Sequence, residues 1–370
     1  PMKRLASLRR VGWCSFGALG LTVPIGFWYR PEVDLSDGYW VHTKDRRIPV
    51  PDGGVWWEAF RSSRALSPRS PDEADPLVLR AARWLVIMSV SLVFRTALTM
   101  LNTFEVDRDQ HFARLLQLVE SRPPGSALIT VSNHSSTIDD PTLLVASMPW
   151  RVLIDTSKIR WVFCTQDICF RRPILAGIAS AGKVLPIKKG GGIDQPLLAE
   201  VQRRIAQGCW LHIFPEGKVN QCRQLGIGHY DNRTATTAAE IGRMKWGVGK
   251  LVAHSPVPVT LIPLHHVGMD DILVMQRQPP YSLDLGSSRL GRRVRLIVGE
   301  EIRFLDLVQD HERVHGELRK FDVSEGEARL SSAAEKMLYS KITRRVEDAL
   351  LTLEQRGLAA WTQQAEAAAE

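Results

Sequence analysis

Cysteine is scarce in this chain of 370 residues, which has five, and none of them forms a Cys-x-x-Cys pair. An odd number at these spacings excludes a disulfide scaffold and a zinc ribbon. A Gly-x4-Gly-Lys-Ser/Thr sequence is also missing, which excludes a P-loop for a nucleotide. We therefore expect a protein that needs neither a metal nor another cofactor. The cysteines are Cys14, Cys164, Cys169, Cys209 and Cys222.

Acidic residues are absent before Glu32, whereas the same stretch carries five basic residues. Residues 11–29 are uncharged, and Trp13 and Trp28 lie near the ends of that run. These features favour a mitochondrial address or a shallow membrane anchor, while a secretory signal peptide and a frayed terminus stay open. We assign residues 1–31 to an N-terminal targeting or membrane-anchor segment.

Only one long, strongly apolar run follows, at residues 84–104, and Arg95 interrupts it. A full membrane span needs about 20 apolar residues in a row, so a complete crossing is not expected. The run fits either a helix that lies in the bilayer interface, with Arg95 reaching the headgroups, or a helix buried in the core. In the first case the membrane-facing residues are Trp84, Leu85, Val86, Ile87, Val93 and Phe94.

Positive charge and tryptophan are in excess. Lysine and arginine outnumber aspartate and glutamate by 48 to 40, which gives a formal net charge of +8. That balance suits an anionic partner such as nucleic acid, a lipid surface or a phosphorylated small molecule. The basic residues are scattered and no recognition-helix or RNA-binding sequence is present, so we expect no nucleic-acid binding. The chain has 11 tryptophans against 5 tyrosines, as proteins do that anchor at a membrane interface.

Short β-branched runs alternate with helical stretches after Pro123, which predicts an α/β fold. We expect a loop-rich linker or insertion at 32–83, a main domain at 84–300 and a C-terminal helical region at 301–370. A long amphipathic helix is expected at 327–356, before a frayed tail. Expected strands lie at 127–131, 161–164, 183–187, 210–214, 257–264 and 292–299, with helices after Pro141, at 194–206 and around 234–253.

The first candidate for chemistry is Asn-His-Ser-Ser-Thr-Ile-Asp-Asp-Pro at 133–141, directly after a predicted strand. His134 and Asp139 would lie about 140° apart around a helix, so they meet only if this segment is a turn. Asp140 as a helix N-cap and Pro141 as the first helical residue favour that turn. Asp139 could then accept the Nδ1 proton of His134 and leave Nε2 free to take a proton from a substrate hydroxyl. A capping turn with a satisfied histidine is the alternative.

Two further loops follow predicted strands. Phe-Pro-Glu-Gly-Lys at 214–218 bends the chain at a strand end, where α/β folds place their sites, and presents Glu216 and Lys218 together. The two lysines and three glycines at 188–192 could cradle a phosphate or form only a flexible surface turn.

In this order, the blocks resemble those of the glycerolipid acyltransferase superfamily, and among its members those of phospholipid–lysophospholipid transacylases. The resemblance covers residues 84–300. It implies an α/β fold with a glycerolipid-acyltransferase-like mixed sheet flanked by helices, and an N-terminal membrane-interfacial helical segment. The blocks that carry it are 133–141, Asp-Ile-Cys-Phe (167–170), Phe-Pro-Glu-Gly-Lys-Val-Asn (214–220), Lys-Trp-Gly-Val-Gly-Lys (245–250) and Pro-Leu-His-His-Val-Gly-Met (263–269).

The resemblance also implies an activity, which is acyl exchange between phospholipids and lysophospholipids with cardiolipin and monolysocardiolipin as central substrates. The expected location is a mitochondrial membrane, inner or outer, facing the intermembrane space, with interfacial attachment. His134 would be the general base and Asp139 its partner, with Lys189 and Lys218 facing phosphate. Glu216 would bind a glycerol hydroxyl or order its loop. The other substrate-binding residues that the resemblance implies are Asn133, Phe214, Pro215 and Gly217.

Two positions depart from the family pattern. Lys189 stands where an arginine is expected, which keeps the charge but loses the bidentate fork on phosphate. In the Pro-Leu-His-His block, His266 matches the family pattern, whereas His265 stands where an aromatic residue is expected. We expect the side chain of His265 to be packed at a strand end.

Two alternative functions stay open. An acyl-CoA-dependent lysophosphatidate-type acyltransferase is the main one, because the first three blocks do not separate donor types. A non-catalytic protein that binds an anionic lipid surface is the alternative from another class. The sequence does not set the oligomeric state, so a homo-oligomer is also open.

Overall fold

The computed structural model describes residues 40–43, 46–49, 77–170, 172–195, 197–219, 244–273, 289–322 and 330–367. The N-terminal segment predicted at 1–31 lies outside them, as does most of the linker predicted at 32–83. Within that linker the structure adds an antiparallel hairpin of β1 (Trp40–Thr43) and β2 (Arg46–Pro49), which the loop-rich prediction did not include. The hairpin belongs to a compact unit, Pro1–Pro49, and the other unit is Val50–Glu370.

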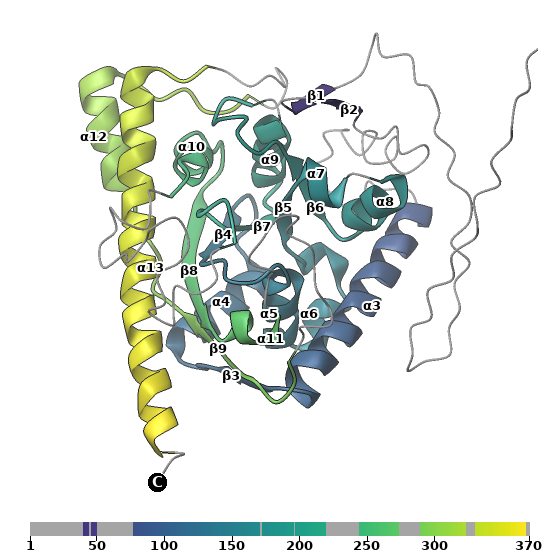
Figure 1. Cartoon of the computed structure of the whole chain (residues 1–370). Coiled ribbons are helices and arrows are strands. Elements are labelled where there is room, and N and C mark those ends of the chain that lie inside the picture. The colour runs from purple at the N-terminus through teal and green to yellow at the C-terminus, as the bar shows by residue number, and fades with distance from the viewer. Residues whose placement is uncertain are drawn as a thin grey trace, which may run out of the picture. The chain divides into compact units, whose positions relative to one another are not determined.

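One seven-stranded sheet organises the second unit, in the order β3-β9-β8-β4-β7-β5-β6 (Figure 1). The pairing of β8 with β9 is antiparallel, and the other neighbouring pairs in this sheet are parallel. The predicted α/β fold with a mixed sheet flanked by helices is therefore confirmed. The strands are β3 (Thr103–Val106), β4 (Ala127–Ser132), β5 (Trp161–Thr165), β6 (Val184–Ile187), β7 (Trp210–Ile213), β8 (Val259–Val267) and β9 (Arg293–Val298).

The central strand β4 is buried at every position, so both of its faces must be covered by other elements. Because side chains alternate along a strand, Ile129 and Val131 enter one hydrophobic cluster while Leu128 enters the other. Helices on the first face are α9 (Leu197–Ala206), α10 (Gly247–Ala253), α12 (Leu305–His315) and α13 (Ala333–Ala367). Helices on the second face are α3 (Leu77–Met100), α4 (Gln110–Ser121), α5 (Asp139–Ser147) and α6 (Trp150–Leu153).

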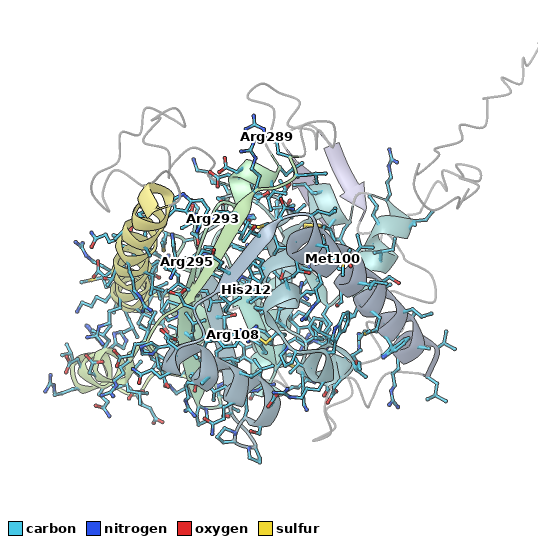
Figure 2. The ribbon with its side chains drawn as sticks, turned by 90° about the horizontal axis from the view of Figure 1, so that it is seen from below. Met100, Arg108, His212, Arg289, Arg293 and Arg295 are labelled. Carbon is cyan, nitrogen blue, oxygen red and sulfur yellow. A yellow bond between two sulfur atoms is a disulfide. The ribbon has the colours of Figure 1, made fainter. Side chains whose placement is uncertain are left out.

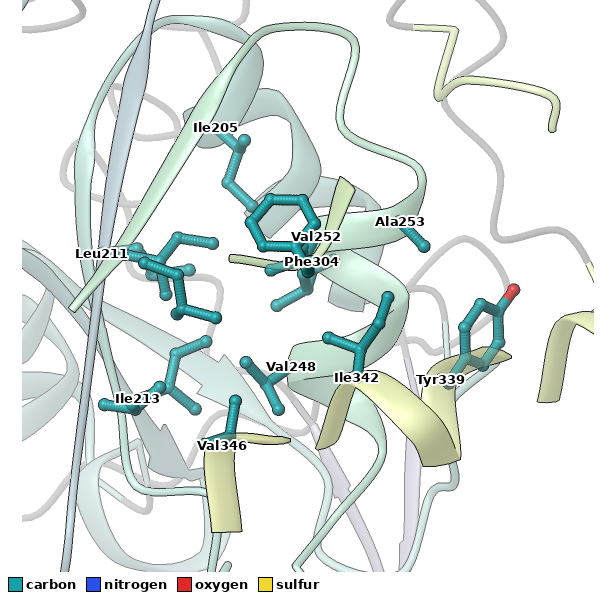
Figure 3. Packing of buried hydrophobic residues seen from close by; sticks show 14 of the residues in the cluster. Ile205, Leu211, Ile213, Val248, Val252, Ala253, Phe304, Tyr339, Ile342 and Val346 are labelled. Atoms are coloured by element: carbon teal, nitrogen blue, oxygen red, sulfur yellow. The ribbon is translucent and has the colours of Figure 1, made fainter. Parts of the chain in front are cut away.

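The C-terminal helix α13 is part of the core of this unit. Tyr339, Ile342 and Val346 pack with residues of α10 and β7 (Figure 3). Gly249 of α10 permits this contact, since a Cβ there would lie 2.4 Å from the backbone oxygen of Tyr339. Gly249, the second glycine of the Lys-Trp-Gly-Val-Gly-Lys block, thus allows α10 to pack closely against α13. The helix runs to Ala367, eleven residues past its predicted end at 356.

Helix α3 begins at Leu77, seven residues before the predicted start of the apolar run. Its inner side packs on the domain, and the guanidinium of Arg83 lies 5.6 Å from the centre of the Trp161 ring. Arg95 also points inward, where Nη1 donates to the carbonyl of Met148 at 2.6 Å. The expectation that Arg95 reaches lipid headgroups is therefore wrong, because a buried carbonyl binds its guanidinium.

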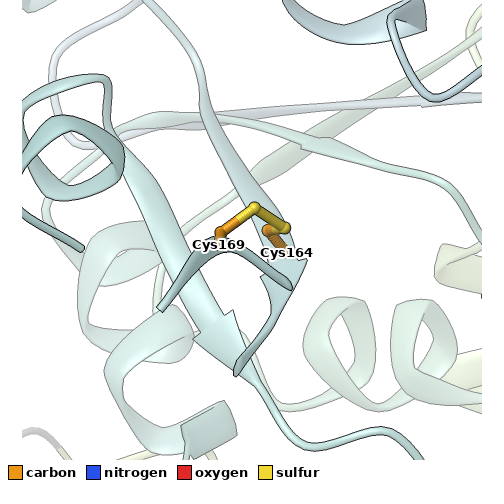
Figure 4. The surroundings of a disulfide bond; sticks show 2 residues. All are labelled: Cys164 and Cys169. Atoms are coloured by element: carbon orange, nitrogen blue, oxygen red, sulfur yellow. A yellow bond between two sulfur atoms is a disulfide. The ribbon is translucent and has the colours of Figure 1, made fainter. Parts of the chain in front are cut away.

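A disulfide joins Cys164, near the end of β5, to Cys169 in α7 (Gln166–Cys169) (Figure 4). The sequence excluded a disulfide scaffold and did not foresee this local link of two cysteines five residues apart. Cys209 is buried and outside any disulfide.

The arginines of β9 account for part of the positive charge. Arg293 and Arg295, labelled in Figure 2, form ion pairs with Glu105 and Asp107, on or just after the neighbouring strand β3. These charges stabilise the strand pairing at this edge of the sheet, because each guanidinium has a carboxylate partner.

Candidate active site

The candidate site forms where three neighbouring strands, β8, β4 and β7, end at the same edge of the sheet. His134 follows β4, Phe214 and Glu216 follow β7, and His266 lies near the end of β8. Parallel neighbours bring their carboxyl ends together, which is where α/β sheets bind ligands. Sequence blocks more than 130 residues apart therefore meet, as in the 133-residue separation of Asn133 and His266.

His134 and Asp139 are in direct contact. The Nδ1 atom of His134 lies 2.9 Å from Oδ2 of Asp139, and the backbone amides of Ser135 and Ser136 donate to the same oxygen at 2.8 and 2.9 Å. The segment is thus a turn closed around the carboxylate, as predicted. Asp139 is fully buried, whereas 19% of the His134 side chain is exposed. No hydrogen bond joins Nε2 of His134 to any described residue, so this nitrogen is available to a substrate.

Asp140 does not cap helix α5, which corrects the sequence prediction. Its carboxylate forms a bidentate ion pair with the guanidinium of Arg160, and both side chains are almost completely buried. The N-cap position is Ile138, which has no side-chain cap. Arg160, which the sequence reading did not select, therefore anchors the residue next to Asp139.

The Phe-Pro-Glu-Gly turn supports His134 from the neighbouring strand. The Phe214 ring stacks on the His134 imidazole, with ring centres 4.1 Å apart and planes 20° apart. Oε1 of the buried Glu216 accepts the backbone N–H of His134 at 3.2 Å. This bond ties the Phe-Pro-Glu-Gly turn to the residue that carries the imidazole, and the predicted contact of Glu216 with a glycerol hydroxyl stays a prediction.

The segment that contains Lys245 packs against this turn at Gly217 and Pro215. Gly217 has a φ of +67°, and a Cβ there would lie 3.0 Å from the Cγ of Lys245. The backbone N–H of Lys245 donates to the carbonyl of Pro215 at 2.7 Å. Lys245 is an exposed cation beside the predicted substrate loop that the sequence reading did not assign.

Asn133 uses its side-chain amide within the protein. Its Oδ1 accepts the backbone N–H of His266, and its Nδ2 donates to the backbone carbonyl of the same residue, both at 3.0 Å. Asn133 was predicted to bind substrate, but both ends of its amide already join β4 to β8. Its contribution to the site is to fix the backbone that precedes His134.

The two predicted phosphate-binding lysines lie in different places. Lys218 is half-buried on the loop after β7, two residues after Glu216. Lys189 is exposed and follows β6, three strand spacings from β4, which is about 14 Å across the sheet. Both follow strands at the carboxyl edge of the sheet, and Lys218 follows β7, the strand next to β4.

The charge states of the buried groups suit a base at His134. Burial alone would raise the pKa of Asp139, but His266 and His134 hold it well below its usual range, so this carboxylate stays ionised. Burial and the Arg160 guanidinium lower the pKa of His212 far below its usual range. His212 is thus a neutral ring hydrogen-bonded to Thr130 and Ser132 at 2.8 and 3.2 Å.

A second carboxyl group near the site was missed by the sequence reading. Asp270 lies in α11 (Met269–Ile272), and burial raises its pKa to about 6. Its Oδ1 atom is buried without a hydrogen-bond partner among the described residues. The Met-Asp-Asp stretch after β8 was the available signal, because acidic residues directly after a strand end lie at this edge of the sheet.

We expect Asp270→Asn to stabilise the fold above pH 6 and to have little effect below pH 4. The unfolded carboxyl loses its proton near its ordinary pKa of 3.8 and the folded one near 6, so rising pH destabilises the wild type across this window. The gain at pH 8 is up to about 3 kcal/mol in the free energy of unfolding. Denaturant titrations at pH 4 and pH 8 measure it. Asp271→Asn, at a less buried neighbour, is the control, and an equal gain at both pH values would contradict the argument.

The comparisons with known proteins agree with this geometry. The family model described as Acyltransferase matches residues 113–267. An N-acylphosphatidylethanolamine synthase from Arabidopsis thaliana is 34% identical over 282 residues, which are 72% of this chain and 90% of that protein. The chain belongs to the glycerolipid acyltransferase family. The prediction of an acyltransferase enzyme is thereby confirmed.

This acyltransferase is also similar to tafazzins, as its sequence blocks predicted. Tafazzin of Drosophila melanogaster is 34% identical over 244 residues, 66% of this chain and 56% of that protein. Taffazin of Dictyostelium discoideum is 34% identical over 179 residues, 47% of this chain and 54% of that protein. The match therefore spans about half the length of these two relatives. Among the described residues, no group of three or more His, Cys, Asp or Glu side chains is placed to hold a metal ion.

Proposed function

We propose that this acyltransferase is a CoA-independent transacylase that moves acyl chains between phospholipids and lysophospholipids. Its central substrates in this proposal are cardiolipin and monolysocardiolipin. The observation that carries the proposal is the contact of Asp139 with Nδ1 of His134 at 2.9 Å, which leaves Nε2 facing a partly open site. The tafazzin relatives support the choice of a phospholipid donor.

In the proposed reaction, Nε2 of His134 takes the proton of a lysophospholipid hydroxyl. The oxygen then attacks the ester carbonyl of the acyl donor and forms a new ester bond. As the old ester bond breaks, the imidazolium returns the proton to the leaving glycerol oxygen. Asp139 holds the ring in the required tautomer and stabilises the imidazolium, as in a Ser-His-Asp triad whose nucleophile is supplied by the substrate.

The basic residues near the site suit the phosphate of a lipid headgroup. Lys218 and Lys245 lie on the two segments that meet at Gly217, and Lys189 lies further along the same sheet edge. In this proposal Lys218 binds the phosphate nearest the reacting hydroxyl, and Lys189 binds a more distant one. A lipid with two phosphates, such as cardiolipin, could contact both.

The donor assay tests this function directly. Radiolabelled monolysocardiolipin is incubated with the purified enzyme and either a diacyl phospholipid or an acyl-CoA as sole donor. We expect label in cardiolipin with the phospholipid and little with acyl-CoA. Transfer from acyl-CoA alone would instead establish the lysophosphatidate-type alternative.

N-Acylation of phosphatidylethanolamine is a second candidate, favoured by the Arabidopsis relative, 90% of which is covered. The same base could take a proton from the headgroup amine, and the product would be an amide in place of an ester. Supplying phosphatidylethanolamine with a labelled acyl donor separates the two, since only the amide survives mild alkaline hydrolysis. A labelled amide without ester exchange would select this candidate.

We further propose that the outer side of α3 lies in the membrane interface. Leu85 and Val93 are 59% and 62% exposed, and Trp84 is also exposed. Val86 and Phe94 are partly exposed, but Ile87 packs inside the domain, so its predicted place at the membrane is wrong. Helix α3 is also long and apolar enough to cross a bilayer. Its packed inner side supports interfacial attachment instead.

Charged substitutions on this side test the attachment. We expect Leu85→Asp with Val93→Asp to weaken binding to cardiolipin-containing vesicles at least about tenfold, because two exposed apolar side chains no longer enter the lipid. Co-sedimentation measures the binding. Met337→Asp, which changes an equally exposed residue of α13, is the control. If the wild type, the double variant and Met337→Asp bind the vesicles equally, α3 does not lie in the membrane interface.

A mitochondrial membrane facing the intermembrane space is the proposed location. The tafazzin relatives support it, and the Cys164–Cys169 disulfide suits an oxidising compartment. Cell fractionation followed by carbonate extraction tests both the membrane and the interfacial mode of attachment.

A further inference from the structure

The Asp139 carboxylate contacts a second imidazole besides that of His134. His266 is completely buried, and its Nε2 atom lies 3.4 Å from Oδ2 of Asp139 and 3.0 Å from the backbone carbonyl of Asn133. A carbonyl oxygen only accepts hydrogen bonds, so Nε2 of His266 must carry the proton. This N–H therefore donates to the Asn133 carbonyl, and its nitrogen lies 3.4 Å from the same carboxylate oxygen that binds Nδ1 of His134.

The backbone of His266 is fixed as firmly as its ring. The side-chain amide of Asn133 accepts from the backbone N–H of His266 and donates to its backbone carbonyl. The imidazole of His266 in turn donates to the backbone carbonyl of Asn133. These three bonds join the end of β8 to the residue before His134. Any movement of His266 would consequently displace both partners of Asp139.

We propose that His266 is a positioning residue that sets the basicity of His134 through their shared carboxylate. The proposal rests on the His134–Asp139 dyad of the proposed function and adds a third member to it. When His266 is neutral, the full charge of Asp139 raises the proton affinity of His134. When His266 is cationic, part of that charge is neutralised, and His134 is a weaker base that remains unprotonated at lower pH.

The electrostatics around His266 allow it to change charge. Burial would lower its pKa, but Asp139 and Asp270 raise it above the usual value. The titratable groups around it come from four elements: Asp139 and His134 from the turn, neutral His212 from β7, Asp270 from α11 and the adjacent His265 on β8. Asp139 is the one in direct contact.

Two substitutions separate the parts of this role. His266→Gln keeps a neutral N–H donor at about the same reach but removes the positive charge. His266→Phe removes both the donor and the charge and keeps the ring volume. His265→Phe is the matched control, because it changes the adjacent buried histidine, whose side chain points to the other face of the strand.

The readouts are kcat, the pH profile of kcat/KM, and the pKa of His134 from NMR titration of Cε1-labelled histidine, with the His134→Ala spectrum as the assignment. We expect His266→Phe to lower kcat about tenfold or more with little change in KM, and His266→Gln to recover most of this loss at pH 8. In both variants the pKa of His134 and the acid limb of the profile should move to higher pH by about one pH unit. His265→Phe should leave both unchanged.

An unchanged His134 titration in both variants would overturn the inference, even if activity falls. Equal losses of activity by His265→Phe and His266→Phe, in proportion to lost folded protein, would also overturn it. The NMR titration does not depend on turnover. If His134→Ala proves active, the proposed function fails while the effect of His266 on His134 is still measured.

Discussion

The His134→Ala variant should have no measurable acyl exchange, with a loss of about 10²- to 10⁴-fold or more in kcat. The substrate hydroxyl is not a nucleophile at neutral pH until a base removes its proton, and Nε2 of His134 is the nitrogen left open at the site. The variant loses the stack on Phe214 and one bond to Asp139, so its melting temperature should fall, but the backbone amides of Ser135 and Ser136 still hold the carboxylate and the protein should fold. Transfer of label from phospholipid to monolysocardiolipin measures the activity, and circular dichroism measures the fold.

The matched control is His315→Ala, which removes an exposed histidine from α12. It should retain full activity, and both variants should bind vesicles like the wild type. Substantial transfer by the folded His134→Ala protein would show that another group is the base, and the dyad would be wrong.

Replacing Asp139 by Asn should lower kcat about 10³- to 10⁴-fold, by analogy with the buried aspartate of serine-protease triads. The carboxylate oxygen Oδ2 accepts from Nδ1 of His134 and from two backbone amides. An amide at this position could present an N–H to His134, which would favour the wrong tautomer and leave Nε2 protonated. Rates per folded enzyme, measured at several pH values, test this.

The same substitution should also destabilise the fold, in a pH-dependent way. The pKa of Asp139 lies below its ordinary value of 3.8, so its contribution to the free energy of unfolding is present above that pH and declines as the pH falls below it. The difference between wild type and Asp139→Asn should thus be largest near neutral pH. Denaturant titrations at pH 7 and pH 3 measure it.

Asp140→Asn is the control for Asp139→Asn, since it changes the adjacent carboxylate in the same way. It leaves the buried Arg160 without its charged partner and should cost about 3–5 kcal/mol of stability. The rate of the folded fraction should fall much less than in Asp139→Asn. Equal rates for the two variants would mean that Asp139 has a structural role only.

Local sequence was enough to predict most strands of the main sheet and the pair His134 and Asp139. Five strands lie within one residue of their predicted bounds, because each β-branched run is buried and bounded by turn residues. The sixth, β8, begins two residues and ends three residues later than predicted. The meeting of His134 with Asp139 was also predictable, since five residues in a turn fix both ends of the contact. The family followed from the order of blocks along the chain.

Contacts between distant segments were decided only by the tertiary structure. Arg160 takes Asp140 away from the predicted cap, because a buried guanidinium needs a carboxylate partner. The carbonyl of Met148 turns Arg95 inward, and the domain covers Ile87. His266 reaches Asp139 because β8 pairs with β4, and no local pattern specifies which strands are neighbours. Spacing along the chain thus determines a turn, whereas the burial and charge of a side chain depend on what the fold packs against it.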